Sequence, residues 1–211
     1  MIKKKDAVLI NVDECFESGI DYARELFLNG SIFIYPTDTI YGFGGNPFNE
    51  IVIKKISVVK GKENWRRYIF LISDIEILKS YADVNSEKYL DFLLSVWPNP
   101  VSVIFKLNKH YQEIFKSETG AFRIPNHRFC HKLISELKMP LVSTSVNRTG
   151  SEPLNDPSLI IQDFSSEVDA IFYSDKKSFF EASTLVDLTG DEPKLVREGR
   201  IKFVELMKKL N

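Results

Sequence analysis

The sequence has few of the features that mark exported, membrane-spanning or disulfide-rich proteins. Only two of its 211 residues are cysteines, Cys15 and Cys130, and their spacing fits neither a disulfide framework nor a metal site. The apolar run near the N-terminus, residues 7–10, is too short for a signal-peptide core or a membrane span. We therefore expect a cytoplasmic protein that is neither exported nor inserted into a membrane.

Several common site signatures are also missing. Lys and Arg (28) nearly balance Asp and Glu (29), so the net charge of −1 gives no general attraction to nucleic acid. There is no Walker loop, and residues 42–45 do not complete a GxGxxG motif. His127 and His131 stand four residues apart but have no evident third ligand, and no serine has the partners of a nucleophile elbow. We therefore expect no metal held by protein ligands and no covalent hydrolase chemistry.

The composition does support a substantial core, with 44% hydrophobic and 12% aromatic residues. Helical and strand patterns alternate for most of the length, and a hairpin pattern near the end indicates a mixed sheet. We predict one α/β domain over residues 1–211, with Asp13 capping the first helix. The first predicted helix includes Phe16 to Phe27, and a short helix follows a cap at Asp74. The other predicted helices lie near residues 49–62, 86–97, 126–137, 155–164 and 204–210, and the strands near 31–35, 68–72, 101–105, 121–124, 141–147, 168–173, 183–188 and 194–197.

The stretch from Tyr35 to Gly45 brings hydroxyls, a carboxylate and glycines directly behind a predicted strand. Pro36 cannot donate to a sheet ladder and ends the strand. Thr37 and Thr39 then stand at the strand exit, where open α/β sheets usually bind ligands. The stretch is either a polar turn or a binding loop.

Other predicted strand and helix ends finish in groups suited to a phosphate-bearing ligand. Arginine offers forked donors to phosphate oxygens, lysine a mobile charge, and serine, threonine and asparagine neutral hydrogen bonds. Taken singly, each group is better explained as a solvated helix end, a surface ion pair or a turn residue. The groups are Lys60 and Lys62, Arg123, Ser143 to Asn147, Ser183 and Thr184, and Arg197.

In order and spacing, seven motifs between about Gly19 and Ile201 resemble the YrdC-like family, the threonylcarbamoyl-AMP synthases. The motifs are Tyr35-Pro-Thr-Asp-Thr-Ile-Tyr-Gly42, Lys60-Gly-Lys62, Trp97-Pro-Asn-Pro100, Phe122-Arg-Ile-Pro-Asn-His127, Pro140-Leu-Val-Ser-Thr-Ser-Val-Asn147, Ser183-Thr-Leu-Val-Asp187 and Arg197-Glu-Gly199. The resemblance implies a twisted mixed sheet flanked by helices around a basic concave cavity, in the short form that lacks an extra C-terminal domain.

The resemblance also implies an activity. Family members make L-threonylcarbamoyl-adenylate from L-threonine, bicarbonate and ATP and release pyrophosphate, which makes them nucleotidyltransferases. The product serves threonylcarbamoyl-adenosine modification of tRNA, so downstream tRNA-modifying proteins are expected partners, with weak binding of tRNA or double-stranded RNA. Mg²⁺ is expected as the ion that accompanies ATP, held mainly by phosphate and water.

Residue roles follow from the resemblance position by position. The family's catalytic KxR and SxN motifs fall on Lys60, Lys62, Ser145 and Asn147, with Lys62 standing where arginine is usual. Threonine binding is implied for Thr37 and Ser183. Nucleotide binding is implied for Lys60, Arg123, Ser143, Ser145, Asn147 and Arg197.

An alternative is an RNA-binding paralogue without synthase activity. It is motivated by the basic run from Lys54 to Arg67 and by the replacement of the usual arginine at Lys62. The near-neutral net charge and the lack of an aromatic RNA platform count against it.

Overall fold

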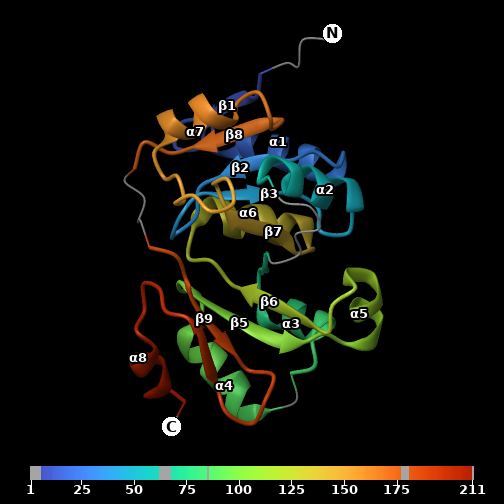
Figure 1. Cartoon of the computed structure of the whole chain (residues 1–211), viewed down its shortest axis with the longest axis vertical. Helices are drawn as coiled ribbons and strands as arrows, with labels where there is room; N and C mark the ends of the chain where they lie inside the picture. Colours follow the sequence, from blue (N-terminus) through green and yellow to red (C-terminus); the bar gives the residue numbers. More distant parts are fainter. Residues whose placement is uncertain (1–5, 62–67, 85, 177–180, 211) are drawn as a thin grey trace. The chain divides into compact units, whose positions relative to one another are not determined.

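The computed structural model describes residues 6–61, 68–84, 86–176 and 181–210 (Figure 1). Strands and helices alternate along the chain, and both parallel and antiparallel pairings occur, so the predicted mixed α/β fold is confirmed. The chain forms two compact units, each made from two separate stretches. Unit 1 contains residues 1–68 and 141–180, and unit 2 contains residues 69–140 and 181–211.

Five strands of unit 1 pair in the order β1-β8-β2-β3-β7. Both β1 and β2 run parallel to β8, whereas β3 runs antiparallel to its neighbours β2 and β7. The chain therefore leaves β2 and β7 at the same end of β3, beside Gly42. The strands are β1 (Val8–Asn11), β2 (Phe33–Tyr35), β3 (Gly42–Gly44), β7 (Leu141–Ser145) and β8 (Ala170–Tyr173).

Three helices bury apolar stripes against these strands: α1 (Phe16–Leu28), α2 (Glu50–Val59) and α7 (Pro157–Phe164). Helices α2 and α7 share one core cluster with Ile34, Phe43 and Ile171. Neighbouring strand residues face the other way, and there Phe172 packs 6.4 Å from the ring of Tyr22 on α1. The layers therefore place α1 on one face of the strands and α2 with α7 on the other, as Figure 1 shows.

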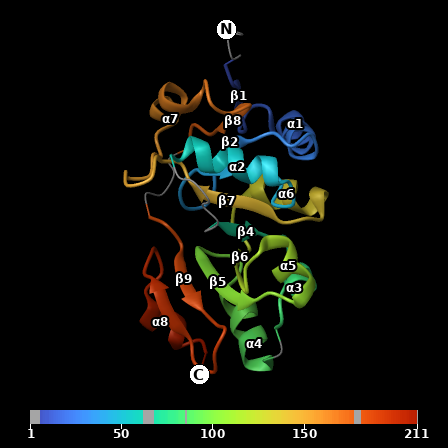
Figure 2. The same ribbon diagram turned by 45° about the vertical axis from the view of Figure 1, so that its right-hand side comes forward.

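In unit 2 the strands pair in the order β4-β6-β5-β9-β10. The pairs β4 with β6 and β5 with β9 are parallel, and the pairs β5 with β6 and β9 with β10 are antiparallel. Figure 2 shows β5 and β9 side by side. The strands are β4 (Ile69–Leu71), β5 (Val101–Lys106), β6 (Thr119–Arg123), β9 (Thr184–Asp187) and β10 (Lys194–Arg197).

The helices of unit 2 are α3 (Ile75–Tyr81), α4 (Glu87–Val96), α5 (Lys109–Phe115), α6 (Arg128–Leu137) and α8 (Phe203–Met207). Asp74 caps α3 as predicted, and Ser86 caps α4; each side chain accepts from a backbone N–H group. Aromatic contacts anchor two helices, because Tyr89 of α4 lies 6.3 Å from Phe105 and Phe115 of α5 lies 4.8 Å from Phe70. No helix within the described ranges is long and apolar enough to cross a membrane.

Three elements were not predicted, and one predicted cap is wrong. Residues 8–11 form β1, Gly42 to Gly44 form β3 in place of a turn, and residues 109–115 form α5. Gly44 has no room for a side chain, since a Cβ there would lie 2.6 Å from the Tyr35 ring. Asp13 does not cap α1, because the helix starts beyond its reach at Phe16 after the N-cap residue Cys15.

Asp13 instead ties the end of β1 to the segment that follows β8. Its Oδ2 accepts from Ser174 Oγ at 2.7 Å and from the Asp175 N–H at 3.1 Å, and its Oδ1 pairs with Lys176 Nζ at 3.0 Å. The hydrogen bond from Ser174 is the main cause that lowers the pKa of Asp13 below its usual value.

We predict that Asp13→Asn lowers the free energy of unfolding by about 1 kcal/mol at pH 7. A lowered pKa in the folded protein stabilises it above the unfolded pKa, and that contribution is lost as pH falls through the folded pKa. The difference between parent and variant should therefore shrink toward low pH in urea titrations. Asp21→Asn, at an exposed position of α1, is the control and should leave stability unchanged. A deficit in Asp13→Asn that is constant with pH contradicts this account.

Candidate functional site

Lys60 stands at the end of α2, with its side chain buried at 4% exposure. Its Nζ donates to the carbonyl of Ser145 at 2.5 Å, to the carbonyl of Asn147 at 3.2 Å and to Asn147 Oδ1 at 2.8 Å. The ring of Phe43 lies 5.6 Å from the same nitrogen. A buried ammonium needs such oxygens, so the end of β7 fixes where this charge sits.

The side chain of Asn147 has one orientation that satisfies all of its neighbours. Its Oδ1 accepts from Lys60 and from Ser145 Oγ at 2.6 Å. Its Nδ2 donates to the carbonyls of Arg148 at 3.0 Å and Ser151 at 2.6 Å. The structure therefore brings Lys60, Ser145 and Asn147 together, as the sequence predicted. Lys62, the fourth predicted member, lies outside the described residues.

The chain direction after Lys60 depends on Gly61, which adopts a φ of 71°. This left-handed conformation suits glycine and ends the helix. The Lys60 carbonyl then accepts from the Thr149 N–H at 2.8 Å. The two segments that carry Lys60 and Asn147 are thus joined through their backbones as well as their side chains.

Arg148 strengthens the same junction, although no sequence signal indicated it. Its guanidinium donates to the Val59 carbonyl and to both carboxylate oxygens of Glu167, and it lies 4.6 Å from the centre of the Phe164 ring. The Glu167 hydrogen bond raises the pKa of Arg148. Because Glu167 is distant in sequence and follows α7, only the folded structure reveals this pairing.

Ser143 lies two residues before Ser145 on β7, and alternation places both side chains on the same face. Its Oγ is so close to β3 that a Cβ on Gly42 would come within 2.9 Å of it. Gly42 thereby leaves room for this hydroxyl. Among the described residues the Ser143 hydroxyl makes no hydrogen bond, so it could bind a ligand. Its role in nucleotide binding stays a prediction.

Thr37 uses its hydroxyl inside its own loop. The Oγ1 donates to the Ile40 carbonyl at 2.7 Å and accepts from the Thr39 N–H at 3.0 Å, and Thr39 Oγ1 lies 2.9 Å away. Because the single proton of Thr37 is used by Ile40, the Thr39 hydroxyl is the donor in their contact. The hydroxyl therefore shapes the loop, and its predicted contact with threonine stays a prediction.

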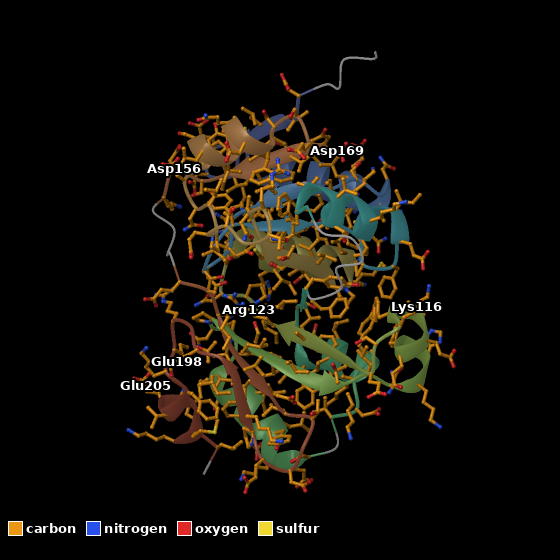
Figure 3. The ribbon with its side chains drawn as sticks, viewed as in Figure 1. Lys116, Arg123, Asp156, Asp169, Glu198 and Glu205 are labelled. Atoms are coloured by element: carbon orange, nitrogen blue, oxygen red, sulfur yellow. The ribbon has the colours of Figure 1, made fainter. Side chains whose placement is uncertain are left out.

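In unit 2, two arginines of the predicted nucleotide site act on one another. Arg123 closes β6 (Figure 3) and is 4% exposed. Arg197 ends β10 and keeps an exposed side chain, whose guanidinium is partly enclosed. This burial, followed by the positive charge of Arg123, lowers the pKa of Arg197. Two cations that repel one another favour an anion between them.

Arg197 is held by neutral oxygens of Ser183. Its Nη2 donates to the Ser183 carbonyl at 3.0 Å and to Ser183 Oγ at 3.3 Å, and its Nε donates to the same carbonyl at 3.3 Å. No carboxylate accepts from Arg197 in the part of the chain that the structure describes. A hydrogen bond thus joins the predicted threonine-binding residue Ser183 to the predicted nucleotide-binding residue Arg197.

Gly199 allows the two segments that carry Arg197 and Ser183 to approach closely. A Cβ at this position would meet the carbonyl oxygen of Ala182 and would lie 2.7 Å from that of Ser183. The Gly199 N–H donates to Thr184 Oγ1 at 3.0 Å, and this hydroxyl donates to the Ile201 carbonyl. Backbone contact of this kind leaves no space for a larger residue.

No cluster of three or more His, Cys, Asp or Glu side chains able to hold a metal occurs among the described residues. His127 is the N-cap residue of α6, and its Nδ1 lies 3.7 Å from the Sγ of buried Cys130. These contacts are those of a structural histidine. Each unit thus holds one candidate group of site residues, and the predicted basic cavity stays a prediction.

Comparisons with known proteins agree in pointing to one family. The Sua5/YciO/YrdC family model, described as "Telomere recombination", matches residues 25–199. The threonylcarbamoyl-AMP synthase of Pyrococcus abyssi (strain GE5 / Orsay) is 27% identical over 204 residues, which cover 95% of this chain and 60% of that protein. The chain therefore spans about three-fifths of the length of this curated relative.

Two solved structures carry the similarity into three dimensions. Sua5 of P. abyssi complexed with L-threonine matches with a TM-score of 0.84 at 25% identity, covering 97% of this chain and 60% of that one. YciO of E. coli matches with a TM-score of 0.81 at 25% identity, covering 92% of this chain and 96% of that one. These matches agree with the α/β fold described above.

The Thr37 hydroxyl can be tested for its role in the loop. We predict that Thr37→Val lowers the free energy of unfolding by about 1–3 kcal/mol, because two backbone groups lose their partner. Thr37→Ser keeps the hydroxyl and should retain most of the stability in urea titrations. Full stability of Thr37→Val would show that the loop does not depend on this hydroxyl.

The close approach at Gly199 makes a second prediction. Gly199→Ala should cost about 1–3 kcal/mol of stability in thermal or urea unfolding, since the added methyl group meets backbone atoms that have little freedom to move. Gly190→Ala is the matched control in the same unit, because a Cβ there meets nothing within 4 Å. Equal stability of the two variants would contradict the predicted crowding.

Proposed function

Because the chain belongs to the Sua5/YciO/YrdC family, we propose that it synthesises L-threonylcarbamoyl-adenylate from L-threonine, bicarbonate and ATP with release of pyrophosphate. The name of the P. abyssi relative and the L-threonine in its Sua5 complex support this choice of reaction and substrate. In this proposal the adenylate passes to tRNA-modifying proteins.

The observation that carries the proposal is the fixed ammonium of Lys60 beside Ser145 and Asn147. Neutral carbonyl and amide oxygens hold this charge in place and do not cancel it. A positioned cation of this kind stabilises negative charge on a nucleotide phosphate. Arg123 and Arg197 supply further positive charge in unit 2.

The proposed chemistry needs positioning and charge more than it needs a protein nucleophile. The amine of threonine combines with bicarbonate to give a carbamate and water. A carbamate oxygen then attacks the α-phosphorus of ATP, the bond from that phosphorus to the bridging oxygen breaks, and pyrophosphate leaves. Negative charge grows on the phosphoryl oxygens in this step, and a positioned cation such as Lys60 would stabilise it.

Roles for the remaining predicted residues follow from their contacts. Ser145 and Asn147 hold Lys60 in place, and Ser143 offers a hydroxyl to the nucleotide. Ser183 offers a hydroxyl to threonine, and Thr37 shapes the loop that follows β2. Mg²⁺ would neutralise charge on the triphosphate, as an ion held mainly by phosphate and water.

An assay of pyrophosphate release tests the proposal. Release should require threonine, bicarbonate, ATP and magnesium together, and Lys60→Ala or Asn147→Ala should reduce it by about two orders of magnitude or more. Lys54→Ala, at an exposed position of the same helix, is the control and should keep parental activity.

Two outcomes would count against the proposal. Pyrophosphate release that is unchanged when threonine is omitted contradicts the reaction. Activity that survives both Lys60→Ala and Asn147→Ala contradicts the assignment of the site. Salt-sensitive RNA binding without threonine-dependent release would favour the RNA-binding alternative.

A further inference from the structure

Ser102 is a polar residue in the middle of an apolar strand. It lies on β5 between Val101 and Val103, and all three residues are fully buried. Its Oγ lies 2.8 Å from Ser183 Oγ, and either atom could be the donor. No other hydrogen bond of the Ser102 side chain occurs within the described residues, so Ser183 is its hydrogen-bond partner there.

The hydrogen-bond capacity of Ser183 decides which way the proton points. A serine hydroxyl has one proton and two lone pairs, and Arg197 Nη2 already occupies one lone pair of Ser183 Oγ. If Ser183 donated to Ser102, the proton of Ser102 would be left without an acceptor in a fully buried place. An unsatisfied buried donor is unfavourable. In the opposite arrangement Ser102 donates to Ser183, and a ligand that accepts the proton of Ser183 then satisfies both hydroxyls.

We infer that Ser102 is a positioning residue that donates to Ser183 and thereby directs the Ser183 proton toward an acceptor oxygen of the substrate. With Arg197 and Ser102 both donating, the two lone pairs of Ser183 Oγ are used and only its O–H remains to be offered. The inference rests on the proposed function, in which Ser183 binds L-threonine.

This arrangement names the part of threonine that Ser183 recognises. A hydroxyl that can only donate binds a carboxylate oxygen and not an ammonium group. The charges nearby agree, because Arg197 and Arg123 are both cations and repel an ammonium group. The amino acid would therefore present its carboxylate to Ser183 and leave its amine free to combine with bicarbonate.

Calorimetric titration with L-threonine tests the inference in the whole chain. Ser102→Ala should weaken threonine binding about five- to tenfold, in line with the loss of one oriented hydrogen bond. ATP binding, measured separately, should stay within about twofold of the parent. Ser102→Thr keeps the hydroxyl and should restore threonine affinity. If Ser102→Ala does not fold, Ser102→Cys takes its place, since a thiol is only a weak donor.

A double-mutant cycle separates positioning from a structural role. If Ser102 acts through Ser183, then adding Ser102→Ala to Ser183→Ala should cause no further loss of threonine affinity. A further loss of the full size, an equal loss of ATP affinity, or parental threonine affinity in Ser102→Ala would each overturn the inference. Failure of the parent protein to bind L-threonine is a distinct result that overturns the proposed function and the inference with it.

Discussion

The hydrogen bonds from the Lys60 ammonium to the segment after β7 are the interaction on which the candidate site depends. They connect the end of a helix to the end of a strand that are far apart in sequence. The pairing of β3 with β7 puts Ser145 opposite Gly42, and the core cluster that contains Val59 holds the helix end in register. A charge buried this deeply is stable only where oxygens are already in place. The position of Lys60 therefore depends on the strand order that places the end of β7 beside it.

Both units use the same way of holding a cation. In unit 1 carbonyl and amide oxygens surround Lys60, and in unit 2 the carbonyl and hydroxyl of Ser183 hold the guanidinium of Arg197. Neutral acceptors fix the direction of such a side chain while its positive charge remains effective toward an anion. This differs from the ion pair of Arg148 with Glu167, where the charges cancel and the result is a structural brace.

Features that depend on residues close together in the sequence could be predicted, whereas features that depend on distant residues could not. The helices capped by Asn49, Asp74, Ser86 and Asp156 were predicted because each cap acts within three residues. Strand β1 was missed because β8, with which it pairs, lies far along the chain, and β3 because two of its three residues are glycines. Motif order predicted Lys60, Ser145 and Asn147 as site residues. It did not reveal that Lys60 binds the Ser145 carbonyl or that Ser102 supports Ser183, since both depend on strand pairing.

The interleaving of the two units has a consequence for how the protein is made. Each unit combines an early and a late stretch of the chain, so a nascent chain that has reached residue 140 completes neither. At that stage β3 lacks β7, β1 and β2 lack β8, and β5 lacks β9, which leaves these strand edges open on the ribosome-bound chain. Unit 1 closes when β7 and β8 emerge, and unit 2 only when β9 and β10 follow. During synthesis these edges stay exposed unless chaperones cover them or the remaining strands are made quickly. The residues of the candidate site are therefore among the last to reach their final positions.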